Sequence, residues 1–194
     1  MASHQLALPG FNKKTASASH GGDLAQSKRK TRRPIDPKQA LHIVLRASIA
    51  RGARSLLHPN HCNHVDTFVH KTARKWGVRL YRYANVGNHL HLLVKVPSRT
   101  AAQRFLKELA GGIAQLVTGA QKGRALPRKA DQERGFWDGL AFTRIVQFGR
   151  DYAGVARYLV GNLFEAAGIP LKRLQAQGYR IQIVGRAGPS AQNP

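Results

Sequence analysis

Short apolar runs in which outward and inward positions alternate recur four times along the chain, and they predict β-strands. They lie at residues 41–48, 78–86, 89–96 and 141–148. The runs are rich in β-branched and aromatic residues and are bounded by turn-forming residues. Only Gly87 and Asn88 separate the second run from the third, so we expect these two strands to pair as an antiparallel hairpin.

Three longer stretches repeat their apolar residues at helical spacing instead. They lie at residues 63–76, 100–118 and 150–167. Gly77 follows the first stretch and Gly168 follows the third, and glycine is a usual signal for the end of a helix. We expect three helices, of which the middle one is weakened at its centre by the pair Gly111 and Gly112.

The resulting order is strand, helix, strand, strand, helix, strand, helix. It indicates an α+β fold: a ferredoxin-like antiparallel sheet with helices packed mainly on one face. We place this domain at residues 39–170. Residues 1–38 are expected to form a basic disordered N-terminal arm, and residues 171–194 a basic C-terminal tail with one further short strand near residue 180. Residues 119–135 are expected to form a mobile basic loop.

Charge narrows the class of partner. The 194 residues include 32 Lys and Arg against 9 Asp and Glu, a net charge of +23. The predicted arm and tail carry only part of this excess, because residues 41–170 alone hold +13. A folded domain with that much self-repulsion indicates a polyanionic partner, and nucleic acid is the first expectation. A basic surface without a specific partner is the alternative.

Other classes are disfavoured by composition. No run of about 18 apolar residues predicts a transmembrane helix, and no basic amphipathic helix indicates membrane binding. The first residues lack the apolar stretch of a secretory signal. Cys62 is the only cysteine, which fits a reducing compartment. We therefore expect a cytoplasmic, nucleoid-associated protein.

Two histidines give the first indication of chemistry. His89 and His91 flank Leu90 on a predicted strand, where alternate residues share a face. Their imidazoles project together and can hold one divalent ion. An ordinary polar surface on a half-buried sheet would show the same pattern.

The last predicted helix adds a second indication. Tyr158 and Asn162 are one turn apart, so their side chains are neighbours. Tyr152 lies instead on the apolar stripe of this helix. A phenol with a pKa near 10 is a poor nucleophile unless a nearby divalent cation assists it. Mg²⁺ prefers oxygen ligands and imidazole suits Mn²⁺ better, so we expect the ion to be Mg²⁺ or Mn²⁺. The alternative is that Tyr158 packs at the rim of the core.

Both segments resemble one protein family. The run GNHLHLLVKV is similar to the His-hydrophobic-His motif of the HUH single-strand DNA endonucleases. FWDGLAFTRIV and ARYLVGNLFEAAGI resemble the C-terminal part of REP-associated tyrosine transposases, which are HUH single-tyrosine transposases. The likeness extends over residues 41–169.

The resemblance implies roles for particular residues. His89 and His91 match metal ligands, Tyr158 matches the nucleophile, Asn162 matches a third ligand, and Asn88 matches the residue before the motif. It further implies a transposase-like endonuclease and strand transferase that cuts single-stranded or hairpin DNA. The cut proceeds through a 5′-phosphotyrosine, with a divalent metal, Mg²⁺ or Mn²⁺, and without a nucleotide cofactor. Such a protein is expected to be a monomer or a homodimer.

Basic and aromatic residues around these motifs are candidates for holding the strand. Arg144 can hold a phosphate, or can be a solvated residue of a strand edge. The other basic candidates are Arg82, Lys95, Lys28, Arg29, Lys30, Arg32 and Arg33. Aromatic residues interleaved with arginines can stack on bases, or can pack in the sheet; they are Trp76, Tyr81, Tyr83, Phe136 and Trp137.

Two alternatives stay open at this point. The cluster His58, His61, Cys62 and His64 can bind zinc, or can be polar residues of a loop and a helix start. The whole protein can be a non-catalytic, domesticated nucleic-acid-binding protein, which the same net charge would predict.

Overall fold

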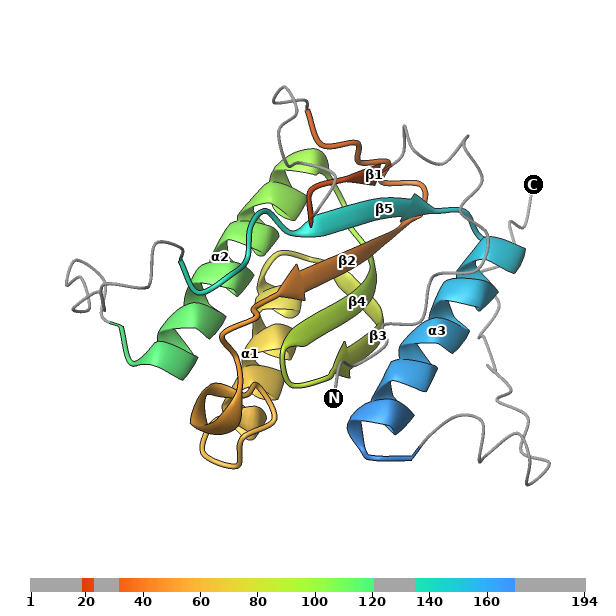
Figure 1. Cartoon of the computed structure of the whole chain (residues 1–194). Coiled ribbons are helices and arrows are strands. Elements are labelled where there is room, and N and C mark those ends of the chain that lie inside the picture. The colour runs from red at the N-terminus through yellow and green to blue at the C-terminus, as the bar shows by residue number, and fades with distance from the viewer. Residues whose placement is uncertain (1–18, 23–31, 121–134, 170–194) are drawn as a thin grey trace, which may run out of the picture.

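A computed structural model of the chain describes residues 19–22, 32–120 and 135–169. Five strands form one antiparallel sheet in the order β1-β5-β2-β4-β3 (Figure 1). The strands are β1 (Ser19–His20), β2 (Ala40–Arg46), β3 (Arg79–Asn85), β4 (His89–Lys95) and β5 (Phe142–Val146). The helices are the short 3₁₀ helix η3 (Gly52–Arg54) and the α-helices α1 (Cys62–Lys75), α2 (Arg99–Thr118) and α3 (Arg150–Ala166).

The four long strands and the first two α-helices have the β-α-β-β-α-β arrangement of a ferredoxin-like domain. β2 and β4 lie side by side in the middle of the sheet, and β3 forms one edge. Figure 1 shows α1 and α2 on one side of the sheet and α3 on the other. The predicted fold class is therefore confirmed, with two of the three α-helices on one face.

The face below α1 and α2 carries the main core. Alternate residues of the two central strands point into it, as the period-two pattern predicts. They are Leu41, Ile43 and Leu45 of β2 and Leu90, Leu92 and Val94 of β4, all at most 2% exposed. Phe105, Leu109 and Ile113 of α2 pack on them. This continuous aliphatic contact holds the sheet in place.

The ends and the contact of the two core helices follow from local sequence. Ser98 caps α2 by accepting a hydrogen bond from the Ala101 N–H at 3.1 Å. Gly77, with φ of 63°, ends the first helix as predicted. Gly112 lets α1 and α2 approach closely, because a Cβ there would collide with the Phe68 ring. Of the paired glycines in α2, Gly112 therefore serves packing, whereas a Cβ at Gly111 would meet open space.

The structure corrects the prediction for parts of the N-terminal arm. Ser19 and His20 pair with β5, and the Arg33 guanidinium donates to Ala141 O and to Thr143 Oγ1, both at 2.7 Å. These segments lie against the edge of the sheet, which offers backbone groups that need partners. Residues 1–18 and 23–31 of the arm, most of the predicted basic loop, and the predicted tail with its short strand fall outside the described residues. No helix in the described residues is long and apolar enough to cross a membrane.

Candidate active site

Aromatic rings from three separate elements meet on the face of the sheet below α3. Tyr158 of α3 lies edge-on to His91 of β4, with ring centroids 5.6 Å apart, and edge-on to His42 of β2, at 6.2 Å. His42 stacks on His91 at 5.8 Å, and His91 stacks on His89 at 5.9 Å. The strand and helix patterns thus bring the predicted histidine pair and the predicted tyrosine together within one molecule.

His89 is held in one orientation by its neighbour in sequence. Its Nδ1 lies 2.7 Å from Asn88 Oδ1, which can only accept a hydrogen bond, so the proton is on Nδ1. The opposite nitrogen, Nε2, is buried and has no partner among the described residues. Burial lowers the pKa of His89, the charge of Arg46 lowers it further, and Asp138 opposes the shift. The imidazole is therefore neutral at physiological pH, with a free lone pair on Nε2.

His91 and His42 are more deeply buried. His91 is 2% exposed, and burial followed by the charge of His89 lowers its pKa to about 3. His42 is fully buried, and burial, His91 and Arg144, in that order, hold its pKa well below the usual value. In the described part of the chain, His91 Nδ1 and both ring nitrogens of His42 lack a hydrogen-bond partner. Buried polar atoms of this kind are costly and are concentrated at functional sites.

His42 is a site residue that the sequence pattern does not indicate. It lies between Leu41 and Ile43 in an apolar run, where the sequence predicts core residues. Its place beside His91 depends on the pairing of β2 with β4, in which Val44 is opposite His91 and His42 is opposite Leu93. The available signal was the alternation itself, because a histidine on the face of β2 that does not enter the main core must face α3.

Asn162 lies one turn beyond Tyr158 on α3 and is half-buried. Its side-chain Nδ2 donates to the backbone oxygen of Tyr158 at 3.1 Å. That bond fixes the amide and leaves Oδ1 as an available acceptor.

These donors fit a divalent cation. Two neutral imidazoles with unpartnered buried nitrogens, His89 and His91, are of the type that binds Mn²⁺ and related ions, and an amide oxygen from Asn162 suits Mg²⁺ or Mn²⁺. The contact of His89 with Asn88 is the outer contact that metal-binding histidines normally make. Within the described ranges, no three His, Cys, Asp or Glu side chains are grouped to hold a metal, so a site here needs a ligand of another type.

Arg46 is a second site residue that the sequence pattern does not indicate. It pairs across β2 and β4 with His89, on the same face of the sheet. Asp138 holds its Nε at 3.2 Å, and Ser48 donates to Asp138 through its backbone N–H at 2.7 Å and its hydroxyl at 2.6 Å. The two terminal guanidinium nitrogens have no partner within the described residues, and the side chain is 49% exposed. A positioned cation with free donors therefore stands beside His89.

Arg144, the predicted phosphate contact, has a different position. It is 7% exposed and makes two hydrogen bonds to the Asp151 carboxylate, at 2.9 and 3.2 Å. Asp151 also accepts from the Gln147 N–H. The ion pair joins β5 to the first turn of α3, so the structure gives Arg144 a structural contact, and its contact with DNA stays a prediction.

The remaining basic candidates are spread over the molecule. Arg82 donates to the backbone oxygen of Tyr81, and Lys95 is half-buried at the end of β4. Arg32 is exposed, whereas Arg33 is bonded to the β5 edge. Lys28, Arg29 and Lys30 lie outside the described residues. None of these is brought to Tyr158 by a described contact.

The aromatic candidates mostly have partners within the fold. Trp76 donates to Glu108 at 2.8 Å, and Trp137 donates to Ala110 O at 2.8 Å while its ring packs on Phe136. Tyr81 contacts the rings of Phe148 and Tyr152, with centroids 6.2 and 5.6 Å apart. Base stacking by these residues stays a prediction.

The zinc alternative finds no support. His61 bonds to the Ser55 backbone oxygen through Nε2 at 2.6 Å and stacks on His58, and Cys62 lies near Pro59 O and Asn63 Oδ1. These are the contacts of a loop and a helix start, which was the other interpretation.

Comparisons with known proteins identify the family and the fold of the chain. A family model described as "Transposase IS200 like" matches residues 37–147, more than half of the chain. One solved structure that the fold matches is a REP-associated tyrosine transposase bound to a REP hairpin. The identity is 14%, the TM-score is 0.50, and the match covers 81% of this chain and 92% of the other. No curated protein matches.

Proposed function

The chain belongs to the family of IS200-like transposases, and from this premise we propose that it cuts and rejoins single-stranded DNA through a covalent bond to Tyr158. The observation that carries the proposal is the meeting of Tyr158 with His91 and His42, at 5.6 and 6.2 Å between ring centroids. α3 lies outside the residues that the family model matches, so this contact is independent of that match.

Tyr158 is the nucleophile. Its hydroxyl attacks the phosphorus of a backbone phosphodiester, and a bond from the phenol oxygen to phosphorus forms while the bond from phosphorus to the 3′ oxygen breaks. The phenol proton passes to solvent and the leaving 3′ oxygen takes up a proton. The product is a 5′-phosphotyrosine and a free 3′-hydroxyl. A 3′-hydroxyl of another strand can then attack the phosphotyrosine, which restores Tyr158 and joins the strands.

His89, His91 and Asn162 would hold a divalent cation. When bound, Mg²⁺ or Mn²⁺ supplies polarisation of the scissile phosphate and neutralises charge in the transition state. Asn88 orients the His89 ring, and the neighbouring His42 ring supports that of His91. The residues of the chain therefore present neutral imidazoles at physiological pH, ready for a cation.

Arg46 binds the same phosphate. Its free guanidinium nitrogens can make paired hydrogen bonds to phosphate oxygens, and Asp138 restricts its orientation. The Asp138 carboxylate in turn accepts from the backbone N–H and the hydroxyl of Ser48, and the Asp138 N–H donates to the backbone oxygen of Arg46. The Arg46 guanidinium thus stabilises the negative charge that develops on the phosphate when Tyr158 attacks.

A strand with a hairpin is the substrate that we propose, because a solved relative of the same fold is described as bound to a REP hairpin. The net charge of +23 fits such a polyanion.

The test is adduct formation with a set of hairpin-bearing single strands in Mg²⁺ or Mn²⁺. We expect wild type to form a covalent protein–DNA species that survives denaturing electrophoresis, and Tyr158→Phe to form none. Tyr152→Phe is the matched control, because it removes a hydroxyl from the same helix and should cut normally. A non-catalytic nucleic-acid-binding protein would bind every strand with a steep salt dependence and give no adduct. That result, or equal adducts from wild type and Tyr158→Phe, would contradict the proposal.

A further inference from the structure

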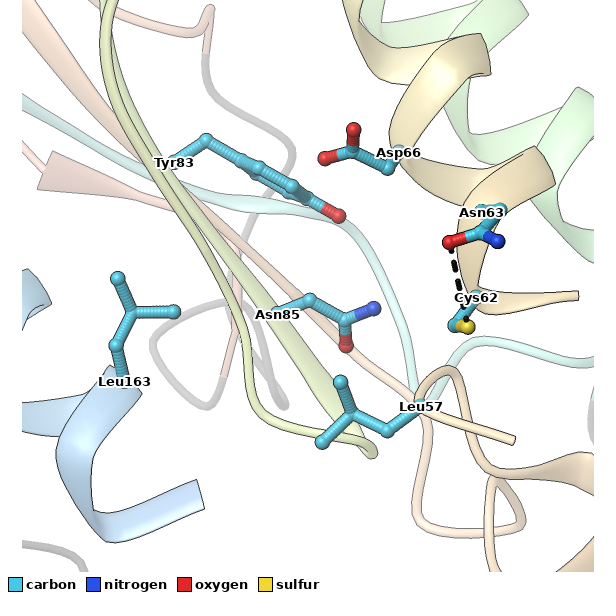
Figure 2. Close-up of a pocket in the computed structure, with 7 residues that line it drawn as sticks. All are labelled: Leu57, Cys62, Asn63, Asp66, Tyr83, Asn85 and Leu163. Atoms are coloured by element: carbon cyan, nitrogen blue, oxygen red, sulfur yellow. Dashed lines mark hydrogen bonds between the residues drawn. The ribbon is translucent and has the colours of Figure 1, made fainter. Parts of the chain in front are cut away.

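A pocket of about 300 Å³ opens at the β3 edge of the sheet. Its walls come from the loop before α1, the start of α1, strand β3 and the end of α3 (Figure 2). Leu163, which lines it, directly follows Asn162, and Tyr83, which also lines it, precedes the Ala84 that pairs with His91. The pocket is therefore one strand away from His91 and beside the end of α3 that carries Asn162.

Tyr83 supplies an unused hydrogen-bond donor in this pocket. Its hydroxyl is buried and has no partner in the described ranges. The nearby Asn85 amide is already engaged, because Nδ2 donates to Leu56 O at 2.9 Å and Oδ1 accepts from the Gly87 N–H at 3.0 Å. Burial and the charge of Asp66 raise the pKa of Tyr83, against a smaller opposing effect of Asn85. The phenol is therefore protonated and available as a donor.

Asp66 supplies two acceptors beside that donor. Figure 2 shows its carboxylate and the Tyr83 hydroxyl on the same side of the pocket, between α1 and β3. Within the described residues, its one ion pair is a long contact of 3.9 Å with His70, and the Asp66 side chain is 57% exposed. The carboxylate therefore keeps free lone pairs for a ligand.

Apolar side chains flank these polar groups. Leu57 and Leu163 line the pocket from two different elements, and both are unusually exposed for leucine, at 43% and 42%. Apolar walls with a few convergent polar groups are typical of a site for a flat, mostly apolar ligand with a polar edge.

We propose that this pocket binds one unpaired guanine of the DNA strand. The Watson–Crick edge of guanine presents two adjacent donors, the amino group and N1–H, followed by the acceptor O6. Asp66 offers two acceptors and Tyr83 one donor, which is the complementary set. On the same edge, thymine has no amino group. Adenine has an amino group but no second donor next to it, because its N1 is an acceptor. The inference rests on the proposed function in one respect, that the ligand strand is single-stranded DNA.

The experiment measures equilibrium binding of the full chain to oligothymidine, and to the same strand with one central guanine or one central inosine. EDTA is present, so that cutting does not interfere. We expect the guanine strand to bind about tenfold more tightly than oligothymidine, since one base edge is worth that much or more. Inosine lacks the amino group and should lose a large part of the advantage.

Two variants with matched controls assign the effect to the pocket. Tyr83→Phe and Asp66→Asn should each reduce the guanine advantage to about twofold or less. Tyr81→Phe removes a hydroxyl from the opposite face of the same strand, and Asp36→Asn removes a carboxylate elsewhere, so both should keep the full advantage. Because Asp66→Asn lowers the negative charge, it should bind oligothymidine at least as tightly as wild type does.

The outcomes separate the pocket from the proposed function. Equal affinity for all three strands, or an unchanged guanine advantage in Tyr83→Phe, would overturn the pocket and leave strand cutting untouched. Failure to bind any strand would contradict both. Free dGMP distinguishes the source of the base: weaker binding than the guanine strand assigns the pocket to DNA, and equal binding would assign it to a free nucleotide and overturn the proposal.

Discussion

The two faces of the sheet differ in what they bury. The face below α1 and α2 is covered by a continuous aliphatic cluster that includes alternate residues of both central strands. The face below α3 has a much smaller apolar cluster, formed around Leu93, Val155 and Leu159, and it shares that space with His42, His91 and Arg144. Several of its buried polar atoms have no partner in the described part of the chain. Stability and chemistry are therefore divided between the two sides of one sheet.

This division explains why the buried, unpartnered imidazoles are tolerated. Burying unpartnered imidazoles costs free energy, and small clusters contribute little to offset it. The large cluster on the other face supplies the stability that this site lacks. Strain and unsatisfied groups at functional sites are tolerated when the surrounding fold is strong enough to hold them.

The largest expected effect is on the free energy of unfolding, when two neighbouring leucines of β4 are replaced. Leu92 and Leu93 are both fully buried but face opposite sides of the sheet. We expect Leu92→Ala to lower the free energy of unfolding by about 4 kcal/mol and Leu93→Ala by about 2.5 kcal/mol, because the smaller cluster loses fewer contacts. Urea denaturation measures both. Equal losses, or a larger loss at Leu93, would contradict the inference that the face below α1 and α2 contributes more stability.

Removing a ligand candidate should separate activity from stability. We expect His89→Ala to reduce cutting at least about a hundredfold, since even the outer contacts of metal ligands are worth up to that factor. The free energy of unfolding should fall by only about 1 kcal/mol, because the variant loses the hydrogen bond from Nδ1 to Asn88 but also removes the buried, unpartnered Nε2. EDTA added to wild type should have the same effect on the cutting rate. A His89→Ala variant that cuts at the wild-type rate would contradict a metal site here.

Arg46 should have a smaller effect on the same reaction. A fully buried donor to a developing charge is worth about a hundredfold or more, but Arg46 is half-exposed, so we expect about a tenfold slower cut in Arg46→Gln. Asp138→Asn should cost less, because the guanidinium remains. Arg51→Gln, which removes an exposed charge after β2, is the control for general loss of DNA affinity. Equal losses in Arg46→Gln and Arg51→Gln would assign Arg46 to background charge only.

Replacing His42 should have the smallest effect on the free energy of unfolding. Its nitrogens are unpartnered, so His42→Leu removes a buried polar group without breaking a hydrogen bond. We expect the free energy of unfolding to stay the same or to rise by up to about 1 kcal/mol. The adjacent Ile43 faces the main core, and Ile43→Ala should be strongly destabilising. Thermal unfolding of the two variants compares them, and a large destabilisation by His42→Leu would show that its ring is a stabilising part of the fold.

The elements were predictable because each carries a local pattern. The alternation in residues 89–96 predicts β4 to within one residue, and Gly77 marks the end of α1. The His89 and His91 pair shares a face for the same local reason. Tyr158 also followed from its own helix, since its neighbours there are apolar on one side only.

The remaining site residues depend on pairings between distant segments. Arg46 reaches its position through β2 and β4 pairing and is held by Asp138 from beyond α2. Arg144 could be taken for a phosphate contact because nothing in its strand reveals Asp151 as a partner. Nothing in the local sequence of Tyr83 indicates that Asp66 lies near it, because the two residues come together only when α1 packs beside β3. Such contacts are fixed by tertiary packing, which periodicity does not encode.

The most direct test of the central claim is the identity of the residue that becomes attached to DNA. The chain has five tyrosines, so the adduct formed with a cleaved hairpin strand can be digested and the modified peptide sequenced by mass spectrometry. We expect the nucleotide phosphate on Tyr158 alone, and only when Mg²⁺ or Mn²⁺ is present. Attachment to Tyr152 or another residue, or cutting without any attachment, would contradict the assignment of Tyr158 as the nucleophile.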